Sequence, residues 1–506
     1  MLALAHTFTL DRTEARHVSV ELDIRAGLPA FTIVGMADPS VREARERIQT
    51  AIRNCGFEFP GRRITVNLAP GDLPKAGPGF DLAIACALLV ASGQLAPVRL
   101  ERLALFGELA LDGTIRPCGG ALAVAEAARD QGFQTIALAC ASGHEAGLVD
   151  GIHVAGLHSL QGAVRVLRGG RPDPLPPPPS ERTRRHDGRL PDLGEVRGRH
   201  HAVRALILAA AGGHNILFTG APGTGKTMLA RRLPSILPPL TRTEAIEVLR
   251  IASAAGARPL ELPRDRPFRA PHHSITAAGL VGGARQSQLG EVVLAHRGVL
   301  LLDELSEFSR PALEALRQPL EDGRIAISRA RHSTIHPTRF MLVAATNPCP
   351  CGHAGEATRC RCSPAELARH RRRLSGPLLD RIDLHLGIHR EVGEDLSAPP
   401  LTSSAKARAE VAEARERQAT RARSTGVLLN AELHSSSLLA HARLDRDGET
   451  ILSEARRSGL LSARGEQRLL RVARTLADLD GRRRVSAHDV AAALALRCEA
   501  QLARSA

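Results

Sequence analysis

Two patterns of apolar residues alternate in the first third of the chain. Within residues 1–167, short apolar runs typical of strands are separated by stretches with helical spacing. The apolar runs lie at residues 18–24, 64–68 and 135–139, and the helical stretches lie at residues 40–55 and 81–92. This alternation predicts an α/β domain over residues 1–167.

The rest of the chain contains two breaks and two further patterns. Residues 168–191 are rich in proline and then in arginine, so they cannot form a packed core and predict a semi-rigid linker. Residues 192–395 again alternate apolar runs and helical stretches, which predicts a second α/β domain. After a break that contains prolines, residues 396–506 have helical spacing almost throughout, and we expect a helical domain there. A chain of 506 residues suits an α/β multidomain fold of this kind.

A glycine-rich loop connects an apolar run to a helical stretch in the second α/β domain. It follows residues 216–219 and reads Gly220, Ala221, Pro222, Gly223, Thr224, Gly225, Lys226, Thr227, with Met228 continuing into the helix. Glycines let backbone N–H groups converge on phosphate oxygens, and a helix N-terminus adds a favourable dipole. Strand, loop and helix in this order predict a P-loop for ATP. Lys226 is expected on the terminal phosphates and the Thr227 hydroxyl on magnesium.

Two further apolar runs end in polar residues. The run at 299–302 precedes Asp303 and Glu304, and the run at 340–346 precedes Asn347. Such runs indicate buried parallel strands, whose carboxyl ends form the ligand-binding edge of a sheet. We therefore expect Asp303 to bind magnesium, Glu304 to activate water as a general base, and Asn347 to position that water or sense the γ-phosphate. For Asn347 alone, a strand-ending turn is the alternative.

The order of these motifs, followed by Leu378-Leu-Asp-Arg381-Ile-Asp383, resembles AAA+ ATPases. The closest resemblance is to the clade of magnesium chelatase subunits and minichromosome-maintenance helicases. It implies that Arg381 is an arginine finger acting on ATP bound by a neighbouring subunit, which requires a ring; a solvated arginine is the alternative. It also implies that the helical domain is the AAA+ lid and that Arg464 contacts the γ-phosphate, although Arg468 and Arg471 lie on a similar spacing.

Further strings extend the resemblance over essentially the whole chain. They lie at residues 34–43, 67–75, 266–273, 347–352 and 473–479. Together they are similar to the YifB/ComM family of magnesium-chelatase-like ATPases. The resemblance implies a hexameric ring ATPase, and for the ComM members it implies a DNA helicase that drives branch migration in recombination during natural transformation.

The first α/β domain resembles the fold of Lon protease, which uses a serine and a lysine. Gly79 stands at the position that matches the nucleophile, and Leu122 at the position that matches the catalytic lysine. Without a nucleophile and its base the site cannot carry out acyl transfer. We therefore expect a non-proteolytic domain that serves assembly or DNA scaffolding.

Four cysteines form a cluster at residues 349–362, within the expected ATPase core. They are Cys349, Cys351, Cys360 and Cys362. Four soft ligands suit a structural zinc ion, although the C-x-C spacing is less usual than C-x-x-C. An iron–sulfur site and free thiols are the alternatives. The remaining cysteines are scattered, which does not suit a disulfide framework.

The charge of the chain bears on its partner. The net charge is +15, and a basic protein of this size is attracted to nucleic acid or anionic surfaces. The only lysines are Lys75, Lys226 and Lys406, and tyrosine and tryptophan are absent, which indicates a compositional bias toward arginine. That bias does not account for the excess of bases over acids. Few aromatic residues argue against tight sequence-specific recognition of a single strand.

A predicted hairpin at residues 323–340 offers candidate DNA contacts. It places Arg329, Arg331 and His332 near its tip, where the related helicases hold the nucleic-acid backbone in the ring pore. A solvated charged hairpin is the alternative. His272 and His273 lie in a loop-rich insertion at residues 270–286, where they either face the pore or cap a turn.

Three function classes follow from these features. The leading hypothesis is an ATP-driven ring motor on DNA, most simply a branch-migration helicase. The alternative is a magnesium-chelatase-like ATPase chaperone that remodels a partner protein, and an ATP-dependent protease is disfavoured by Gly79 and Leu122. No apolar stretch approaches the ~20 residues of a membrane span, and no secretory signal is evident, so we expect a cytoplasmic protein.

Overall fold

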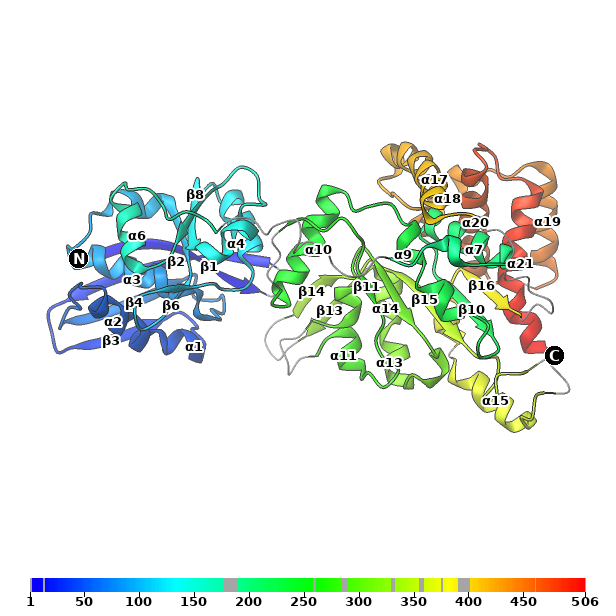
Figure 1. The fold of residues 1–506 in the computed structure, drawn as a ribbon, viewed down its shortest axis with the longest axis horizontal. Helices are drawn as coiled ribbons and strands as arrows, with labels where there is room; N and C mark the ends of the chain where they lie inside the picture. Colours follow the sequence, from blue (N-terminus) through cyan, green and yellow to red (C-terminus); the bar gives the residue numbers. More distant parts are fainter. Residues whose placement is uncertain are drawn as a thin grey trace. The chain divides into compact units, whose positions relative to one another are not determined.

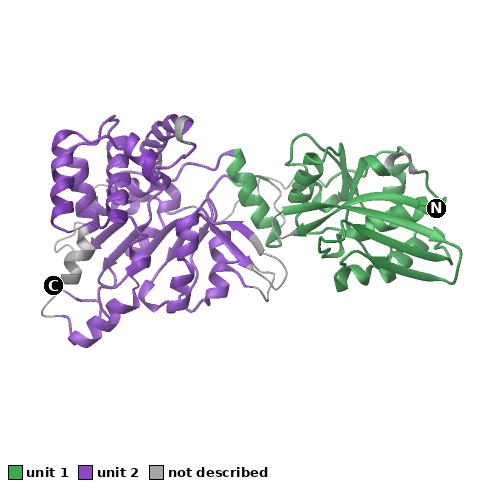
Figure 2. Cartoon of the chain, turned by 180° about the vertical axis from the view of Figure 1, so that it is seen from behind, with its two compact units in different colours: residues 1–186, 242–263 green, residues 187–241, 264–506 purple. Residues whose placement is uncertain are grey.

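The computed structural model separates the chain into two compact units (Figure 2). It describes residues 2–11, 14–176, 190–257, 261–283, 289–328, 333–354, 359–374, 376–389, 401–459 and 461–505. Unit 1 comprises Met1–His186 and Arg242–Pro263, and unit 2 comprises Asp187–Thr241 and Arg264–Ala506.

Unit 1 is built on a seven-stranded mixed sheet in the order β3-β4-β2-β1-β5-β8-β9. Strands β1, β2 and β4 pair antiparallel, and the other neighbours pair parallel. The strands are β1 (Leu2–Asp11), β2 (Glu14–Arg25), β3 (Ala30–Val34), β4 (Arg63–Ala69), β5 (Leu103–Phe106), β8 (Thr135–Ala139) and β9 (His153–Leu157), with a separate pair β6 (Glu108–Leu109) and β7 (Ile115–Arg116). The predicted α/β character of this region is confirmed.

The helices of unit 1 cover this sheet. They are α1 (Pro39–Arg42), α2 (Ala44–Asn54), α3 (Asp81–Ala91), α4 (Ala121–Asp130), α5 (Gly143–Ala146), α6 (Leu160–Leu167) and α10 (Arg242–Ala254). Every residue of α3 is buried, because this apolar helix packs against β1 and β2 and is also contacted by α2 and α6.

Helix α10 shows that the chain does not divide at a single point. Residues 242–263 fall within the range 192–395 that the sequence assigns to one domain, yet they are packed in unit 1 (Figure 2). Ser253 of α10 donates a hydrogen bond of 2.5 Å to the buried Glu145 carboxylate. A buried carboxylate needs such donors, so this bond helps to fix α10 in unit 1.

Unit 2 contains a five-stranded parallel sheet in the order β11-β12-β15-β10-β16. Its strands are β11 (Phe268–Arg269), β12 (Val299–Leu302), β15 (Met341–Thr346), β10 (Ile216–Gly220) and β16 (Leu384–Ile388). Every residue of β12 and β15 is buried, which explains their continuous apolar sequences. The order places β12, β15 and β10 side by side, so the residues that follow them meet at one edge of the sheet.

Helices surround this sheet and continue to the C-terminal end (Figure 1). They are α7 (His200–Gly212), α8 (Lys226–Ala230), α9 (Leu233–Ile236), α11 (Ala277–Val281), α12 (Glu291–Leu294), α13 (Arg310–Ala315), α14 (Arg317–Asp322), α15 (Pro364–Arg373), α16 (Gly376–Leu379), α17 (Ser404–Thr425), α18 (Ser435–His441), α19 (Arg446–Arg457), α20 (Ala463–Leu479) and α21 (Ala487–Ser505). The helical C-terminal region is confirmed. Its α17 and α20 pack on α7, and α21 packs on β16, so they share one apolar core with the sheet.

An antiparallel hairpin separates β12 from β15 in sequence. It consists of β13 (Arg324–Ser328) and β14 (Ser333–Pro337), and Ser328 pairs with Ser333. The hairpin predicted over residues 323–340 is therefore present. The candidate DNA contacts Arg329, Arg331 and His332 lie outside the described residues. Among the helices that the structure describes, none has both the length and the apolar character needed to cross a membrane.

Candidate functional site

The P-loop lies between β10 and α8, as the sequence pattern predicts. Gly223 and Gly225 have φ angles of 75° and 83°, in the left-handed region that favours glycine. The Thr224 hydroxyl donates to the Ala221 carbonyl at 2.8 Å and closes the loop on itself. Helix α8 begins at Lys226, so its free N–H groups point into the loop, where they can bind phosphate.

The Lys226 ammonium is buried at the edge of the sheet. Its Nζ donates to the carbonyls of Gly220 and Ala221 at 2.7 and 2.8 Å and to Asn347 Oδ1 at 3.1 Å. Burial lowers the pKa of Lys226, and the nearby Asp303 carboxylate opposes this shift. An anionic phosphate would offset the cost of burying this cation, which fits the predicted role of Lys226.

Thr227 and Asp303 come together although they are separated by 76 residues in sequence. The Thr227 hydroxyl donates to Asp303 Oδ2 at 2.7 Å, and Asp303 Oδ1 accepts the Glu304 backbone N–H at 3.0 Å. A hydroxyl and a carboxylate side by side are oxygen ligands of the kind that magnesium prefers. These two residues would hold the ion, which would supply charge neutralisation to the phosphates when bound.

Glu304 lies at the same edge, beyond the end of β12. Its backbone adopts φ 53° and ψ 49°, a conformation uncommon for residues other than glycine, and its side chain is 58% exposed. His273 Nδ1 lies 3.2 Å from Glu304 Oε2. The sequence left open whether His273 faces the pore or caps a turn, and it contains no signal that links this residue to Glu304.

Asn347 follows β15, and both its side chain and its backbone carbonyl form hydrogen bonds. Its Oδ1 accepts from Lys226, and its carbonyl accepts from the Thr346 hydroxyl at 3.2 Å. Nε2 of the buried His370, on α15, lies 2.9 Å from the same carbonyl. Sequence reasoning missed His370, whose place beside Asn347 depends on how the chain folds back after the cysteine cluster.

Arg381 and Arg464 both lie near Glu321 of α14. The Arg381 side chain is only 12% exposed, forms an ion pair with Glu321 and donates to the Pro377 carbonyl at 2.7 Å. Arg464 is 77% exposed and lies 3.9 Å from Glu321. Among the hydrogen bonds and ion pairs of the described residues, those of Arg381 and Arg464 do not reach the P-loop. Their predicted roles toward ATP stay predictions.

Buried polar groups connect Arg381 to the sheet. The Asn215 side chain donates to the Arg381 carbonyl at 3.2 Å and accepts the Leu342 backbone N–H at 2.8 Å. Asp383 is buried, with Arg468 Nη1 at 3.2 Å and His214 Nδ1 at 3.4 Å. Burial alone would raise the pKa of Asp383, but His214, Arg468 and Arg471 outweigh it and lower the pKa to about 2.

The cysteine cluster has the geometry of a metal site. The Sγ atoms of Cys349, Cys351, Cys360 and Cys362 all lie within 4.8 Å of one another. The separations are 3.3 Å between Cys349 and Cys351 and 3.8 Å between Cys351 and Cys360. Thiolates at about 2.3 Å from a tetrahedral ion are about 3.8 Å apart, so these residues fit such an ion. Backbone N–H groups of Arg361 and His353 lower the pKa of the Cys351 thiol to about 6, which favours the thiolate.

The cysteine cluster borders the P-loop. Gly352, between Cys351 and His353, has φ 85°, and a Cβ atom at this position would lie 2.3 Å from Cδ of Pro222. Only glycine therefore allows this close approach. The cluster also begins two residues after Asn347 in sequence. It is therefore linked to the candidate nucleotide site through Asn347 and through Pro222.

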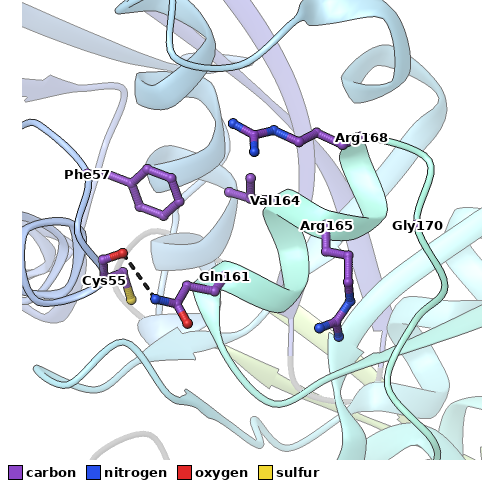
Figure 3. A pocket seen from close by; sticks show the side chains of 7 residues that line it. All are labelled: Cys55, Phe57, Gln161, Val164, Arg165, Arg168 and Gly170. Carbon is purple, nitrogen blue, oxygen red and sulfur yellow. Dashed lines mark hydrogen bonds between the residues drawn. The ribbon is translucent and has the colours of Figure 1, made fainter.

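A hollow lies in unit 1 (Figure 3), whereas the residues of the P-loop belong to unit 2. It has a volume of about 490 Å³ and is lined by Cys55, Phe57, Gln161, Val164, Arg165, Arg168 and Gly170. Gln161 donates to the Cys55 carbonyl at 3.1 Å, and Arg165 is paired with Asp173. With its polar groups paired in this way, the hollow lacks a convergent set of free catalytic groups among the residues described.

Comparisons with known proteins cover nearly the whole chain. Residues 20–142 match the family described as subunit ChlI of Mg-chelatase, residues 192–396 match magnesium chelatase, subunit ChlI, and residues 401–497 match the C-terminal part of that subunit. The chain is 43% identical to the uncharacterized protein YifB of Escherichia coli over 484 residues, which is 95% of this chain and 94% of YifB.

Two further relatives differ in how much they share. The competence protein ComM of Haemophilus influenzae is 40% identical over 506 residues, covering 99% of this chain and 98% of ComM. The magnesium-chelatase 67 kDa subunit of Chlorobaculum parvum is 30% identical over 158 residues, which is 30% of this chain and 23% of that subunit. On these matches and on the P-loop geometry, the chain belongs to the magnesium-chelatase-like family of AAA+ ATPases that includes YifB and ComM.

Proposed function

We propose that this protein is an ATP-hydrolysing ring motor that acts on DNA and promotes branch migration during recombination. The observation that carries the proposal is the meeting of four side chains at one sheet edge: Lys226 with Asn347, and Thr227 with Asp303. These groups bind the phosphates and magnesium, and Glu304 beside Asp303 accepts a proton from the attacking water. The similarity to the competence protein ComM along 99% of the chain supports a role in competence.

The proposal includes a ring in which a neighbouring subunit completes the site. A further cation on the γ-phosphate, beside Lys226, would stabilise the charge of the transition state. Arg381 is the finger that a neighbouring subunit contributes, and Arg464 closes the site from the lid. The support is that both arginines converge on Glu321 within one chain, which keeps them together near a single surface carboxylate. Six subunits are the assembly that the resemblance implies.

The hairpin β13–β14 is the element that holds DNA. Arg329, Arg331 and His332 lie in the connection between these strands and neutralise backbone phosphates without reading sequence. The net charge of +15 favours this partner. The hairpin lies between β12 and β15 in sequence. A short stretch of chain therefore connects the DNA-binding hairpin to the residues that hydrolyse ATP.

The cysteine cluster holds a structural zinc ion. Four thiolates fill a tetrahedral coordination sphere, so the ion has no open position for catalysis. Its role is to stiffen the segment between Asn347 and α15, where Gly352 packs on Pro222 of the P-loop.

Unit 1 provides a Lon-like scaffold without protease activity. A Cβ atom at Gly79 would lie 2.3 Å from the ring of Phe106, so a serine does not fit there without repacking. Leu122 is completely buried. Both positions that match the Lon dyad therefore lie in apolar surroundings and carry no catalytic group. Assembly or DNA scaffolding is the role that we propose for this fold.

ATPase measurements on the full-length protein test the proposal. The rate is measured without DNA, with linear duplex and with a four-way junction, for the wild type, Lys226→Ala and Glu304→Gln. We expect the junction to stimulate the wild type and both variants to lose at least about 100-fold in kcat. Unchanged hydrolysis in Lys226→Ala would contradict the assigned site, and absence of DNA binding at low salt would contradict the DNA motor.

Hairpin variants test the DNA contact separately. Arg329→Ala with Arg331→Ala should weaken binding to all sequences alike and reduce the slope of log affinity against log salt by about 2. Arg324→Ala, at the base of the hairpin, is the matched control. An unchanged salt slope in the tip variant would place the DNA contact elsewhere.

The alternative function, a magnesium-chelatase-like chaperone that remodels a partner protein, has narrower support. The alignment with the Chlorobaculum parvum chelatase subunit spans 158 residues and 23% of that subunit, whereas the alignment with ComM spans 506 residues and 98% of ComM. Strong ATPase activity that does not respond to any DNA would favour this alternative.

A further inference from the structure

Two hollows of unit 1 share the segment of residues 57–62, which lies between α2 and β4. Phe57 lines the hollow of Figure 3, which we call the Phe57 hollow. Phe59 lines a second hollow of about 240 Å³, the Phe59 hollow. Each hollow therefore receives one aromatic ring from the same segment, and the two rings are two residues apart in sequence.

The segment is held in place from both sides of one peptide unit. The Glu58 backbone N–H donates to Gln94 Oε1, and Gln94 Nε2 donates to the Glu58 carbonyl, both at 2.8 Å. The Phe57 N–H donates to the Ile52 carbonyl of α2 at 3.0 Å. Because Glu58 stands between the two phenylalanines, these bonds fix the backbone that carries both rings. A fixed backbone lowers the entropic cost of placing the rings against a ligand.

The Phe59 hollow has an aromatic wall. Phe31 of β3 and Phe59 both line it, and each packs against the apolar core while remaining partly exposed. Their centroids are 6.3 Å apart and their planes are inclined by 32°, which is within the range of direct aromatic contact. The two rings therefore offer one surface on which a planar group can stack. The hollow is smaller than the sites of about 300–1,000 Å³ that hold drug-sized ligands, which suits a single base.

Arginines surround this aromatic wall. Arg45, Gln49 and Arg53 line the hollow at intervals of four residues on α2, so they share one face of the helix. Arg62 lines it from the segment itself. Cζ of Arg53 lies 6.0 Å from the centroid of the Phe59 ring, at the outer limit of a cation–π contact. Among the described residues that line this hollow, none is acidic.

The positive charge of the Phe59 hollow is only weakly compensated. Arg45 Nε lies 3.8 Å from Glu46 Oε1, with side chains that are 50% and 78% exposed, so this pair contributes little. Among the hydrogen bonds and ion pairs of the described residues, none involves the guanidinium of Arg53 or Arg62. A bound anion would therefore not have to displace a carboxylate from these two groups.

The Phe57 hollow repeats the combination of a phenylalanine with arginines. In Figure 3 the Arg168 side chain extends toward Phe57. Its Nη2 donates to the Gln94 carbonyl at 3.4 Å, a long hydrogen bond that engages one of the five N–H donors of a guanidinium. Arg165 is paired with Asp173, so Arg168 is the better placed partner for a phosphate.

We propose that residues 57–62 and the flanking arginines form a binding site for single-stranded DNA, in which successive bases stack on Phe57 and Phe59. Arg53 and Arg168 pair with the phosphates of these nucleotides. Stacking of this kind does not read sequence, because every base has a π-face. The site rests on the proposed function in that DNA is the partner, and it gives unit 1 the task of holding a single strand. It requires neither the hairpin β13–β14 nor ATP hydrolysis.

Photochemical cross-linking tests where the strand lies. The full-length protein is irradiated with an oligodeoxythymidine that carries iodouracil, and the product is digested with trypsin and analysed by mass spectrometry. Cleavage after Arg53 and Arg62 releases both phenylalanines in one peptide, residues 54–62. We expect this peptide to carry the cross-link. Its absence, when other peptides of the same sample are cross-linked, would overturn the inference.

Variants of Phe59 test the stacking. Phe59→Leu keeps an apolar side chain on the core but removes the ring, and we expect the Kd for oligodeoxythymidine to rise about 5- to 50-fold. Phe59→Tyr should remain close to the wild type. Phe133→Leu makes the same change at another partly exposed ring of unit 1 and is the matched control. Equal Kd values for the two leucine variants would contradict stacking on Phe59.

Arg53→Ala tests the phosphate contact without touching the core. It should reduce the slope of log affinity against log salt by about 0.7, the contribution of one phosphate contact on a single strand. Arg129→Ala removes an exposed arginine of α4 and should leave the slope unchanged. An unchanged slope in Arg53→Ala would remove this arginine from the site and overturn the inference.

The outcomes separate this site from the proposed function. If the four-way junction stimulates ATP hydrolysis but Phe59→Leu binds the single strand like the wild type, the site fails and the DNA motor stands. If no DNA stimulates hydrolysis but peptide 54–62 is cross-linked, the site stands and the DNA motor fails. A changed oligomer size in Phe59→Leu with unchanged strand affinity would identify a contact between subunits instead. Displacement of the strand by an equal nucleotide concentration of thymidine monophosphate would assign a site for free nucleotides, and either result would overturn the inference.

Discussion

The Thr227 hydroxyl donates a hydrogen bond of 2.7 Å to the Asp303 carboxylate, which joins helix α8 to the carboxyl end of strand β12. The two residues follow β10 and β12, which are separated by β15 in the sheet. The P-loop and the first turn of α8 carry Thr227 past the end of this intervening strand, and the bond places two oxygen ligands together. We therefore expect magnesium to bind between these two oxygens.

Thr227→Val should impair magnesium-dependent hydrolysis, because valine has the shape of threonine but cannot ligate the ion. We expect the magnesium concentration needed for half-maximal activity to rise about 10- to 100-fold, whereas Thr227→Ser should remain close to the wild type. Magnesium titrations of ATPase activity measure this difference. Equal behaviour of the valine and serine variants would show that the hydroxyl does not bind the metal.

Arg381 should act on ATP held by another subunit. Arg381→Ala and Lys226→Ala are each expected to be inactive alone, but a mixture should recover part of the activity, since mixed rings contain some interfaces with both wild-type residues. Arg381→Lys should not substitute, because a lysine cannot reproduce the guanidinium geometry. Absence of recovery in mixtures that are shown to co-assemble would argue against a finger acting between subunits.

The cysteine cluster should bind one zinc ion per chain. Cys360→Ser is expected to lose the metal and to lower the ATPase rate, because the segment after Asn347 loses its support. Cys118→Ser makes the same chemical change outside the cluster and should retain both metal and activity. Metal analysis of freshly purified proteins decides the matter, and an iron–sulfur cluster would instead be revealed by visible absorption.

Asp383 should contribute to stability in a pH-dependent way. The pKa of this carboxyl is about 2 in the folded chain, below its usual value, so the charged form stabilises the fold above about pH 4. That contribution, on the order of 2 kcal/mol, is lost as the pH falls from about 4 to about 2. Chemical denaturation at several pH values measures the change in the free energy of unfolding.

Asp383→Asn should be destabilising at pH 7 by about 3 kcal/mol, because it leaves Arg468 without its buried counter-charge. Asp480→Asn, at an exposed ion pair, should change the free energy of unfolding by less than about 1 kcal/mol. If the two variants unfold alike, the network around Asp383 contributes little.

Local sequence was sufficient for the main elements of the site. The predicted strands at residues 64–68 and 135–139 correspond to β4 and β8, and the loop after residue 219 lies between β10 and α8. These features can be predicted from sequence because strands and the P-loop depend on the apolar spacing and glycine content of a short, continuous stretch of chain. The same reasoning places Asp303 and Asn347 after buried strands.

Other features depended on how distant segments pack. The sequence assigns residues 242–263 to the second α/β domain, but α10 packs in unit 1, where Ile246 and Leu249 join an apolar cluster and Ser253 donates to Glu145. The sequence predicted a four-thiol metal site despite the less usual C-x-C spacing, but the folding back of the chain at residues 359–362 is what brings the four sulfur atoms within 4.8 Å of one another.

The sequence by itself thus located the residues that we expect to carry the phosphate, magnesium and water chemistry, since each follows a strand that its own apolar pattern encodes. Only the tertiary structure decided that β15 lies between β10 and β12, that Glu321 pairs with Arg381, and that His273 meets Glu304. The physical reason is that contacts between segments far apart in sequence arise from the packing of the sheet and its connections, which no local spacing specifies.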